Sequence, residues 1–310
     1  MWYLIAAIGF GSTFSILFKL CQRWGVDRMQ VIFYNYVTAA LTSWGPLLLR
    51  EALGSGAGTE GLDLCGQADA AVAGLPSMAW VLAPVLGLLF MSSFIVNDLS
   101  VKKSGVALTT VSVRLSLVIP VLMSWLLLGQ SEPRWLSVAL ILAAMILIAL
   151  SSGRPAGGRP SDRKPGWSLV LVFLTYGVCD FLLKYAQHIV TAEAGNTDVL
   201  KAYIFLSAMV LSFIVCLSRG SFRRTTTPQP RWKAILAGIF LGLANMLCTT
   251  LVLKALGTMP ATVFFPLYNI GIVLVVSLVG ILGFREPLRP GHIAGLLLAA
   301  AALAILGGGA

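Results

Sequence analysis

Charged residues are scarce in this sequence. Its 310 residues include only 22 lysines and arginines and 12 aspartates and glutamates, so 11% of the chain is charged, whereas soluble domains carry about 25%. Hydrophobic residues make up 58% of the chain, and the mean hydropathy is +0.89. A soluble globule of this size could not bury so much apolar surface, and disordered chains are far more polar. The composition therefore predicts an integral membrane protein.

The sequence also lacks the short motifs that enzymes and metalloproteins carry. It has no HExxH for zinc, no GxSxG nucleophile, no Walker motif for ATP, and no paired carboxylates suited to Mg²⁺. Its five cysteines form no CxxC pair, and the two histidines, His188 and His292, are far apart in the chain. We therefore expect no enzymatic activity, no bound metal and no cofactor.

Long runs with few charges determine the expected fold. A helix needs about 20 apolar residues to cross about 30 Å of hydrocarbon, so ten crossings leave about 110 residues for connections. The sequence predicts an all-α integral membrane protein with ten transmembrane helices, at residues 2–21, 29–49, 78–100, 104–126, 134–151, 167–187, 199–218, 231–254, 259–284 and 288–308.

These helices are expected to form two five-helix repeats, residues 1–151 and 167–310. The linker between them, residues 152–166, contains three prolines and four glycines, as flexible connections do. Because five is an odd number, the second half would enter the membrane from the opposite side, and such inverted repeats recur in secondary transporters. Three pairs of segments recur in the same order in both halves: Lys19–Gln22 with Lys184–Gln187, Lys102–Val111 with Lys254–Val263, and Gly129–Pro133 with Gly283–Pro287.

The distribution of basic residues predicts the orientation in the membrane. Fifteen lysines and arginines lie on the side of connections 1–2, 3–4, 5–6, 7–8 and 9–10, only four, Lys201 among them, lie on the other side, and three lie within the apolar runs. The positive-inside rule then places the first set in the cytoplasm and both termini outside a plasma or inner membrane. The net charge of +10 is explained by contact with anionic lipid. The basic loops lack interleaved aromatic residues, so we expect no nucleic-acid partner.

Two five-helix halves, each with Gly-x-x-Glu-Pro after its fourth helix, resemble the EamA-like branch of the drug/metabolite transporter superfamily. The segments that carry the resemblance are Gly129–Pro133 and Gly283–Pro287. The resemblance covers nearly the whole chain, and it implies a secondary transporter that exports or exchanges a small polar metabolite by alternating access. It names no substrate. An integral-membrane enzyme or a flippase acting on a lipid-linked substrate is the alternative.

Arg114 is the most unusual residue within the apolar runs. It lies ten residues into segment 104–126, or about 15 Å along a helix, and therefore near the middle of the membrane. Ionisable residues at this depth usually face the bundle interior or a water-filled path. Because a guanidinium holds carboxylate or phosphate at two points, we interpret Arg114 as a contact for an anionic group of the substrate. A structural bond to helix carbonyls or to a carboxylate is the alternative.

Asp180 and Lys184 are the next candidates. They are four residues apart, so they lie on one face of a helix and are close enough to form an ion pair. Burial would also suit Asp180 to carry a coupling proton. The sequence leaves both roles open.

Three neutral residues, Asn245, Tyr268 and Asn269, complete the set of candidate substrate contacts. Their alternative role is to link helices by hydrogen bonds. Pro120, Pro260 and Pro266 are expected to break or bend their helices and thereby free carbonyl groups to line a cavity.

Overall fold

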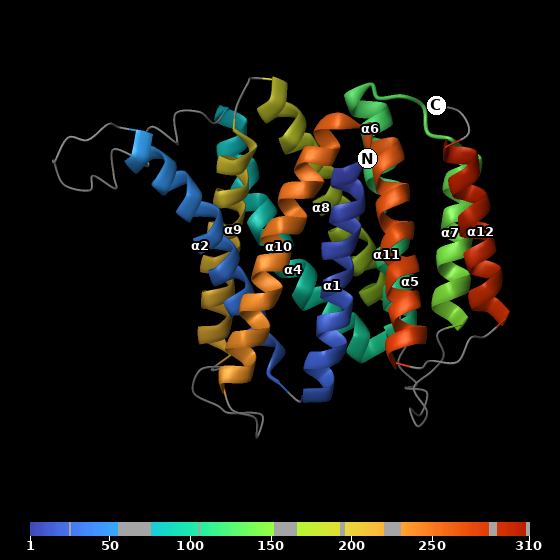
Figure 1. Ribbon diagram of the computed structural model, residues 1–310, viewed down its shortest axis with the longest axis horizontal. Coiled ribbons are helices and arrows are strands. Elements are labelled where there is room, and N and C mark those ends of the chain that lie inside the picture. The colour runs from blue at the N-terminus through green and yellow to red at the C-terminus, as the bar shows by residue number, and fades with distance from the viewer. Residues whose placement is uncertain are drawn as a thin grey trace. The chain divides into compact units, whose positions relative to one another are not determined.

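The computed structural model describes residues 1–24, 26–54, 76–104, 106–151, 166–192, 196–219, 231–284 and 290–307. About 93% of these residues are helical, and none of them lies in a strand. The helices are α1 (Trp2–Trp24), α2 (Arg28–Gly54), α4 (Ser77–Ser104), α5 (Val106–Leu115), α6 (Val118–Leu128), α7 (Trp135–Ser151), α8 (Gly166–Ala192), α9 (Thr197–Ser218), α10 (Arg231–Thr258), α11 (Ala261–Phe284) and α12 (Pro290–Gly307) (Figure 1).

Within the described residues, six helical segments are long and apolar enough to cross a bilayer. Only 28% to 50% of the residues in each apolar stretch are buried, so half or more are at least partly exposed, which an aqueous surface would not tolerate over such large areas. The protein is therefore an all-α membrane protein. The six segments are Ser77–Val101, Leu108–Leu128, Gly166–Ala192, Thr197–Ser218, Arg231–Thr258 and Ala261–Val279.

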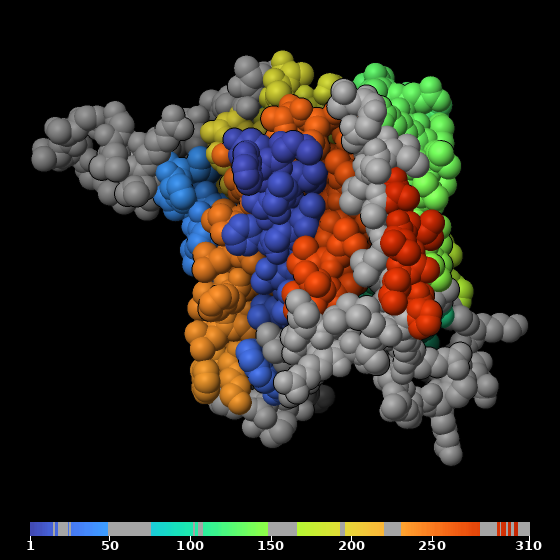
Figure 2. Space-filling view, turned by 45° about the vertical axis from the view of Figure 1, so that its right-hand side comes forward, coloured from blue at the N-terminus to red at the C-terminus, as the bar shows by residue number. Residues whose placement is uncertain are grey.

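Helix α10 illustrates the outward apolar surface. Its exposed large side chains recur every three or four residues, so they form a stripe along one side of the helix. Figure 2 shows part of α10 in orange at the molecular surface. Such a stripe suits contact with lipid chains. Its members are Trp232, Leu236, Ile239, Phe240, Leu243 and Leu247.

The predicted segment 104–126 is interrupted in the structure. Helix α5 ends at Leu115 and α6 begins at Val118, with Pro120 in the first turn of α6. Proline lacks an N–H group and its ring clashes with the carbonyl four residues earlier, so it ends the preceding helix. The expected break is thus confirmed at Pro120. Helix α11, in contrast, continues through Pro266.

The chain packs as two compact units. Unit 1 comprises Met1–Ser12, Ser92–Tyr185 and Thr258–Ala310, and unit 2 comprises Thr13–Met91 and Ala186–Gly257. Each unit combines segments from both predicted five-helix halves. The sequence halves are therefore not the units of packing.

In unit 1, α7 lies along α12, and α11 packs against α6, α7 and α12 (Figure 1). Two close approaches fix α11 on the first part of α1. A Cβ atom on Gly271 would collide with the side chain of Ile8, and one on Gly11 would lie 2.7 Å from the hydroxyl of Tyr268. Small residues at these positions therefore let the two helices pack closely.

The connection after α6 holds the start of α11. Gly129 adopts the left-handed conformation (φ 60°) that commonly ends a helix. The next side chain, Gln130, accepts a hydrogen bond from the backbone N–H of Ala261 at 2.7 Å, and the hydroxyl groups of Ser131 and Thr262 lie 3.4 Å apart. The first amide of α11 has no partner within its own helix, so Gln130 acts as its cap.

Removing this cap is expected to lower stability. Gln130→Ala should cost about 1 kcal/mol, the usual effect of losing a helix cap, and should lower the thermal unfolding midpoint of the detergent-purified protein. Gln130→Glu keeps an acceptor oxygen near the positive end of α11 and should retain most of the stability. Equal losses in the two variants would show that the hydrogen bond is not what stabilises this connection.

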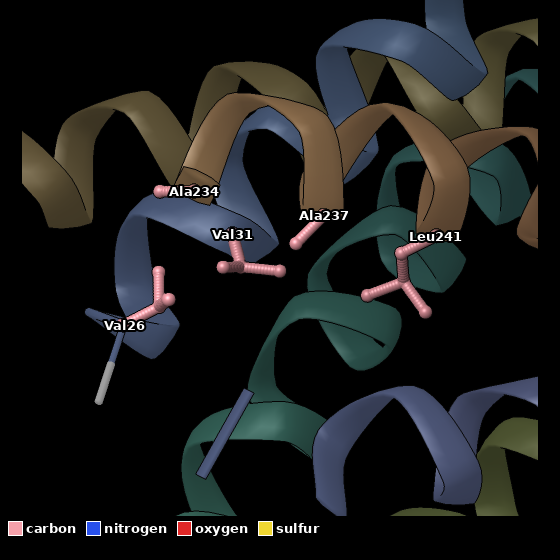
Figure 3. Packing of buried hydrophobic residues seen from close by; sticks show 5 residues of the cluster. All are labelled: Val26, Val31, Ala234, Ala237 and Leu241. Carbon is pink, nitrogen blue, oxygen red and sulfur yellow. The ribbon is translucent and has the colours of Figure 1, made fainter. Parts of the chain in front are cut away.

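In unit 2, α2 lies beside α9 (Figure 1), and α10 approaches α2 through a Gly-x-x-x-Gly sequence. A Cβ atom on Gly238 would collide with Tyr34, and one on Gly242 would lie 2.5 Å from the carbonyl oxygen of Asn35. Such glycines let two helix backbones come close in a membrane. Figure 3 shows the apolar side chains at this crossing: Val26 just before α2, Val31 in the first turn of α2, and Ala234, Ala237 and Leu241 on α10.

Lys201 also belongs to unit 2. It lies near the start of the predicted helix 199–218, and the structure places it inside α9, only 5% exposed. Its Nζ atom lies 2.7 Å from Asp198 Oδ1 and donates to the hydroxyl of Thr250 on α10 at 2.8 Å. The ion pair and the hydrogen bond compensate for the burial of this cation.

Candidate functional site

Unit 1 brings together two of the predicted substrate-binding residues. Nη1 of Arg114, on α5, donates a hydrogen bond to Oδ1 of Asn269, on α11, at 2.9 Å. The Nδ2 group of Asn269 donates to the carbonyl of Phe265 at 3.1 Å. This second bond holds the amide with its oxygen toward the guanidinium. Arg114 and Asn269 therefore form an oriented pair that spans two helices.

Arg114 lies beside the interruption between α5 and α6, in the last turn of α5. The carbonyl groups at this interruption are hydrogen-bonded: that of Arg114 accepts from the N–H of Leu117 at 3.4 Å, and that of Ser116 accepts from the N–H of Ile119 at 3.0 Å. The hydroxyl of Ser116 donates to the carbonyl of Val113 at 2.6 Å. The polar partner of the guanidinium is therefore the side chain of Asn269.

Most of the hydrogen-bonding capacity of Arg114 is unused. A guanidinium has five N–H donors. Nε is buried and has no hydrogen-bond partner in the described part of the chain, where Nη1 makes the bond to Asn269. A buried donor without an acceptor costs about 1–3 kcal/mol, so this arrangement favours a ligand that supplies acceptors.

Helix α8 contributes two polar groups to the surroundings of the guanidinium. Tyr176 and Asp180 both interact electrostatically with Arg114. They are four residues apart and thus lie on one face of α8. The hydroxyl of Tyr176 accepts a hydrogen bond from Nδ2 of Asn97, on α4, at 3.0 Å, so α4 holds this tyrosine in place.

Tyr268 joins the same cluster from α11. Its hydroxyl interacts electrostatically with Arg114. Its ring is nearly parallel to that of Phe264, with the centroids 5.3 Å apart and an interplanar angle of 14°. Stacking on one side and the close approach to Gly11 fix this side chain.

Asp180 and Lys184 do not form the ion pair that their spacing allows. Among the residues that the structure describes, the Asp180 carboxylate makes no hydrogen bond or ion pair, and the charge that acts on it is that of Arg114. Lys184 is only 4% exposed. The structure therefore associates Asp180 with Arg114, and its role as a proton carrier stays a prediction.

Asn245, the remaining candidate, belongs to unit 2. Its Nδ2 donates to Oδ1 of Asn35, on α2, at 3.3 Å, and both side chains are buried. This bond links α10 to α2 beside the close approach at Gly242. The contact corresponds to the helix-linking alternative for Asn245.

The sequence analysis did not single out Asn97 or Tyr176. A signal for Tyr176 was present, because it lies one helical turn before Asp180 in an apolar segment. Asn97 is 79 residues away from Tyr176 in the chain, so only the fold reveals their contact. Within the described ranges, no group of three or more histidine, cysteine, aspartate or glutamate side chains could hold a metal ion.

No protein-family model matches this chain. An uncharacterized protein of Haemophilus influenzae is 25% identical over 304 residues, which are 97% of this chain and 95% of the relative. A crystal structure of another protein is similar over 99% of this chain and 95% of that chain, with a TM-score of 0.69 and 17% sequence identity.

Both similarities extend over nearly the whole chain. The match to the crystal structure concerns the fold alone at 17% identity.

Proposed function

We propose that this protein is a secondary transporter that exports or exchanges a small polar metabolite by alternating access, like the EamA-like transporters that its sequence resembles. The observation that carries the proposal is a partly buried, oriented arginine inside apolar helices, whose buried Nε donor is unused. A purely structural arginine would be expected to have its donors satisfied by the protein. A substrate bound at the site would satisfy the unused N–H donors of Arg114 only during transport.

The packing of the helices supports ten transmembrane helices arranged as two inverted repeats. By position in the proposed halves, α2 corresponds to α9, α6 to α11, and α7 to α12. Each of these three pairs is in contact, the first in unit 2 and the others in unit 1. Helices close to a two-fold axis pack against their own counterparts, and transporters built from inverted repeats bind substrate near the midplane.

The proposed orientation in a plasma or inner membrane has both termini outside and the linker 152–166 in the cytoplasm. Single cysteines introduced by Glu60→Cys and Pro160→Cys, in a variant without the five native cysteines, test this topology. A membrane-impermeant thiol reagent should label position 60 in intact cells and position 160 only after permeabilisation. Labelling of position 160 alone in intact cells would reverse the assignment.

Flux through vesicles tests the function itself. Purified protein is reconstituted and exposed to the small-molecule fraction of a cell extract under an imposed pH or sodium gradient. At least one water-soluble compound should accumulate in a saturable manner, and an ionophore that collapses the gradient should prevent this. Turnover or translocation of lipid without solute accumulation would instead favour a membrane enzyme or a flippase.

A further inference from the structure

We propose that Arg114 binds a carboxylate or phosphate group of the transported compound side-on, through Nε and Nη2, while Nη1 stays bonded to Asn269. The proposal rests on the function proposed above and adds a substrate class to it. Arginine commonly binds such oxyanions through two parallel N–H···O bonds.

The hydrogen bonds already present determine which edge of the guanidinium is available. Nη1 is occupied by Oδ1 of Asn269 at 2.9 Å, and that oxygen is fixed by the bond from Nδ2 to the carbonyl of Phe265. Nε is buried and has no acceptor among the described residues. The edge formed by Nε and Nη2 is therefore the one that offers two parallel donors to a planar or tetrahedral oxyanion.

Tyr176 supplies a further donor for the same group. Its hydroxyl oxygen accepts from Asn97 at 3.0 Å, so its hydrogen points away from that bond, and it makes no other hydrogen bond within the described residues. It interacts electrostatically with Arg114. Tyr176 is therefore a neutral donor on α8, oriented by Asn97, in the electrostatic surroundings of the guanidinium.

The balance of charge favours an anion over a cation or a neutral compound. Among the described residues, the charged group that acts electrostatically on Arg114 is Asp180, which makes neither an ion pair nor a hydrogen bond with any of them. The arginine is therefore not neutralised by direct contact. An oxyanion that touches Nε and Nη2 would supply that contact, whereas an uncharged amide of the same shape supplies one acceptor oxygen and no charge.

Ligand-induced stabilisation tests this site without knowledge of the natural substrate. The detergent-purified full-length protein is heated with sodium acetate, sodium benzoate or inorganic phosphate, and with acetamide or benzamide, at constant ionic strength. At least one oxyanion should raise the unfolding midpoint in a saturable manner, and the matching amide should not. Arg114→Lys should weaken the apparent affinity roughly tenfold or more, which corresponds to about 1.4 kcal/mol, and Arg114→Ala should abolish the effect.

Two further variants, one control and one second test, show whether the oxyanion effect depends on the site around Arg114. Arg134→Ala removes an exposed arginine outside the helices and should leave the oxyanion effect unchanged. Tyr176→Phe should weaken it while preserving the fold, and it decides the matter if Arg114→Ala does not fold. Oxyanion stabilisation that survives both Arg114→Lys and Tyr176→Phe, or its absence in the wild-type protein, would overturn the proposal. Gradient-driven uptake of an uncharged compound in the vesicle assay would also overturn the proposed anion site. That result would still support the proposed transport function.

Discussion

Changing Asp180 to asparagine is expected to uncouple transport from the pH gradient while substrate exchange continues. Asp180 provides negative charge close to Arg114 in a region of apolar helices. When an anion binds to Arg114, a second negative charge nearby becomes unfavourable, so the carboxylate should take up a proton together with the substrate. Asparagine has the shape of the protonated acid and cannot release a proton.

In reconstituted vesicles, accumulation driven by a pH gradient should fall roughly tenfold or more in Asp180→Asn, and exchange of labelled for unlabelled substrate should stay within about twofold of the wild-type rate. Glu132→Gln is the matched control, because Glu132 is an exposed carboxylate outside the helices. If Asp180 instead formed a structural ion pair with Lys184, Asp180→Asn would lower the stability of the protein. Adding Lys184→Met to that variant would then restore the stability. Restored transport driven by the pH gradient in the double variant would exclude Asp180 as the proton carrier.

The second large effect is expected at Gly242. An alanine Cβ there would lie 2.5 Å from the carbonyl oxygen of Asn35, a backbone atom that cannot move without shifting α2. Overpacking of this kind costs about 1–3 kcal/mol, so Gly242→Ala should lower the unfolding midpoint and the yield of folded protein. The displacement would also disturb the hydrogen bond between Asn245 and Asn35.

Gly9→Ala is the matched control for this prediction. Gly9 lies in a helix as well, but a Cβ atom there meets no atom within 4 Å. Because alanine favours helices by about 1 kcal/mol over glycine, this variant should be neutral or slightly stabilised. If Gly242→Ala were as stable as Gly9→Ala, the close approach of α10 to α2 would not contribute to the stability of unit 2.

The sequence predicts the all-α membrane class, because a chain in a bilayer must satisfy its backbone locally and long apolar runs therefore become helices. It also predicts the interruption at Pro120, which follows from the covalent structure of proline. It does not distinguish Pro120 from Pro266, because α11 continues through its proline. Whether a proline stops a helix depends on the neighbouring helices, which the local sequence does not specify.

The candidate site could be predicted in part. Arg114 stands out because a charge in an apolar run is costly, and Asn269 stands out as a polar residue in another run. Their contact joins residues 155 positions apart, and the cap that Gln130 provides for Ala261 joins residues 131 positions apart. Periodicity within one helix cannot reveal such pairs. The spacing of Asp180 and Lys184 permits an ion pair, but the surroundings of α8 associate Asp180 with Arg114 instead.

The most direct test of the central claim, transport through a site formed around Arg114, compares metabolites in the medium and the cytosol of cells. Three strains are needed: one with the wild-type protein, one without it, and one with Arg114→Ala present in the membrane at an equal amount. The account predicts that at least one metabolite with a carboxylate or phosphate group is redistributed across the membrane only in the wild-type strain. If no compound is redistributed, or if the same compound is redistributed equally by Arg114→Ala, the claim is contradicted.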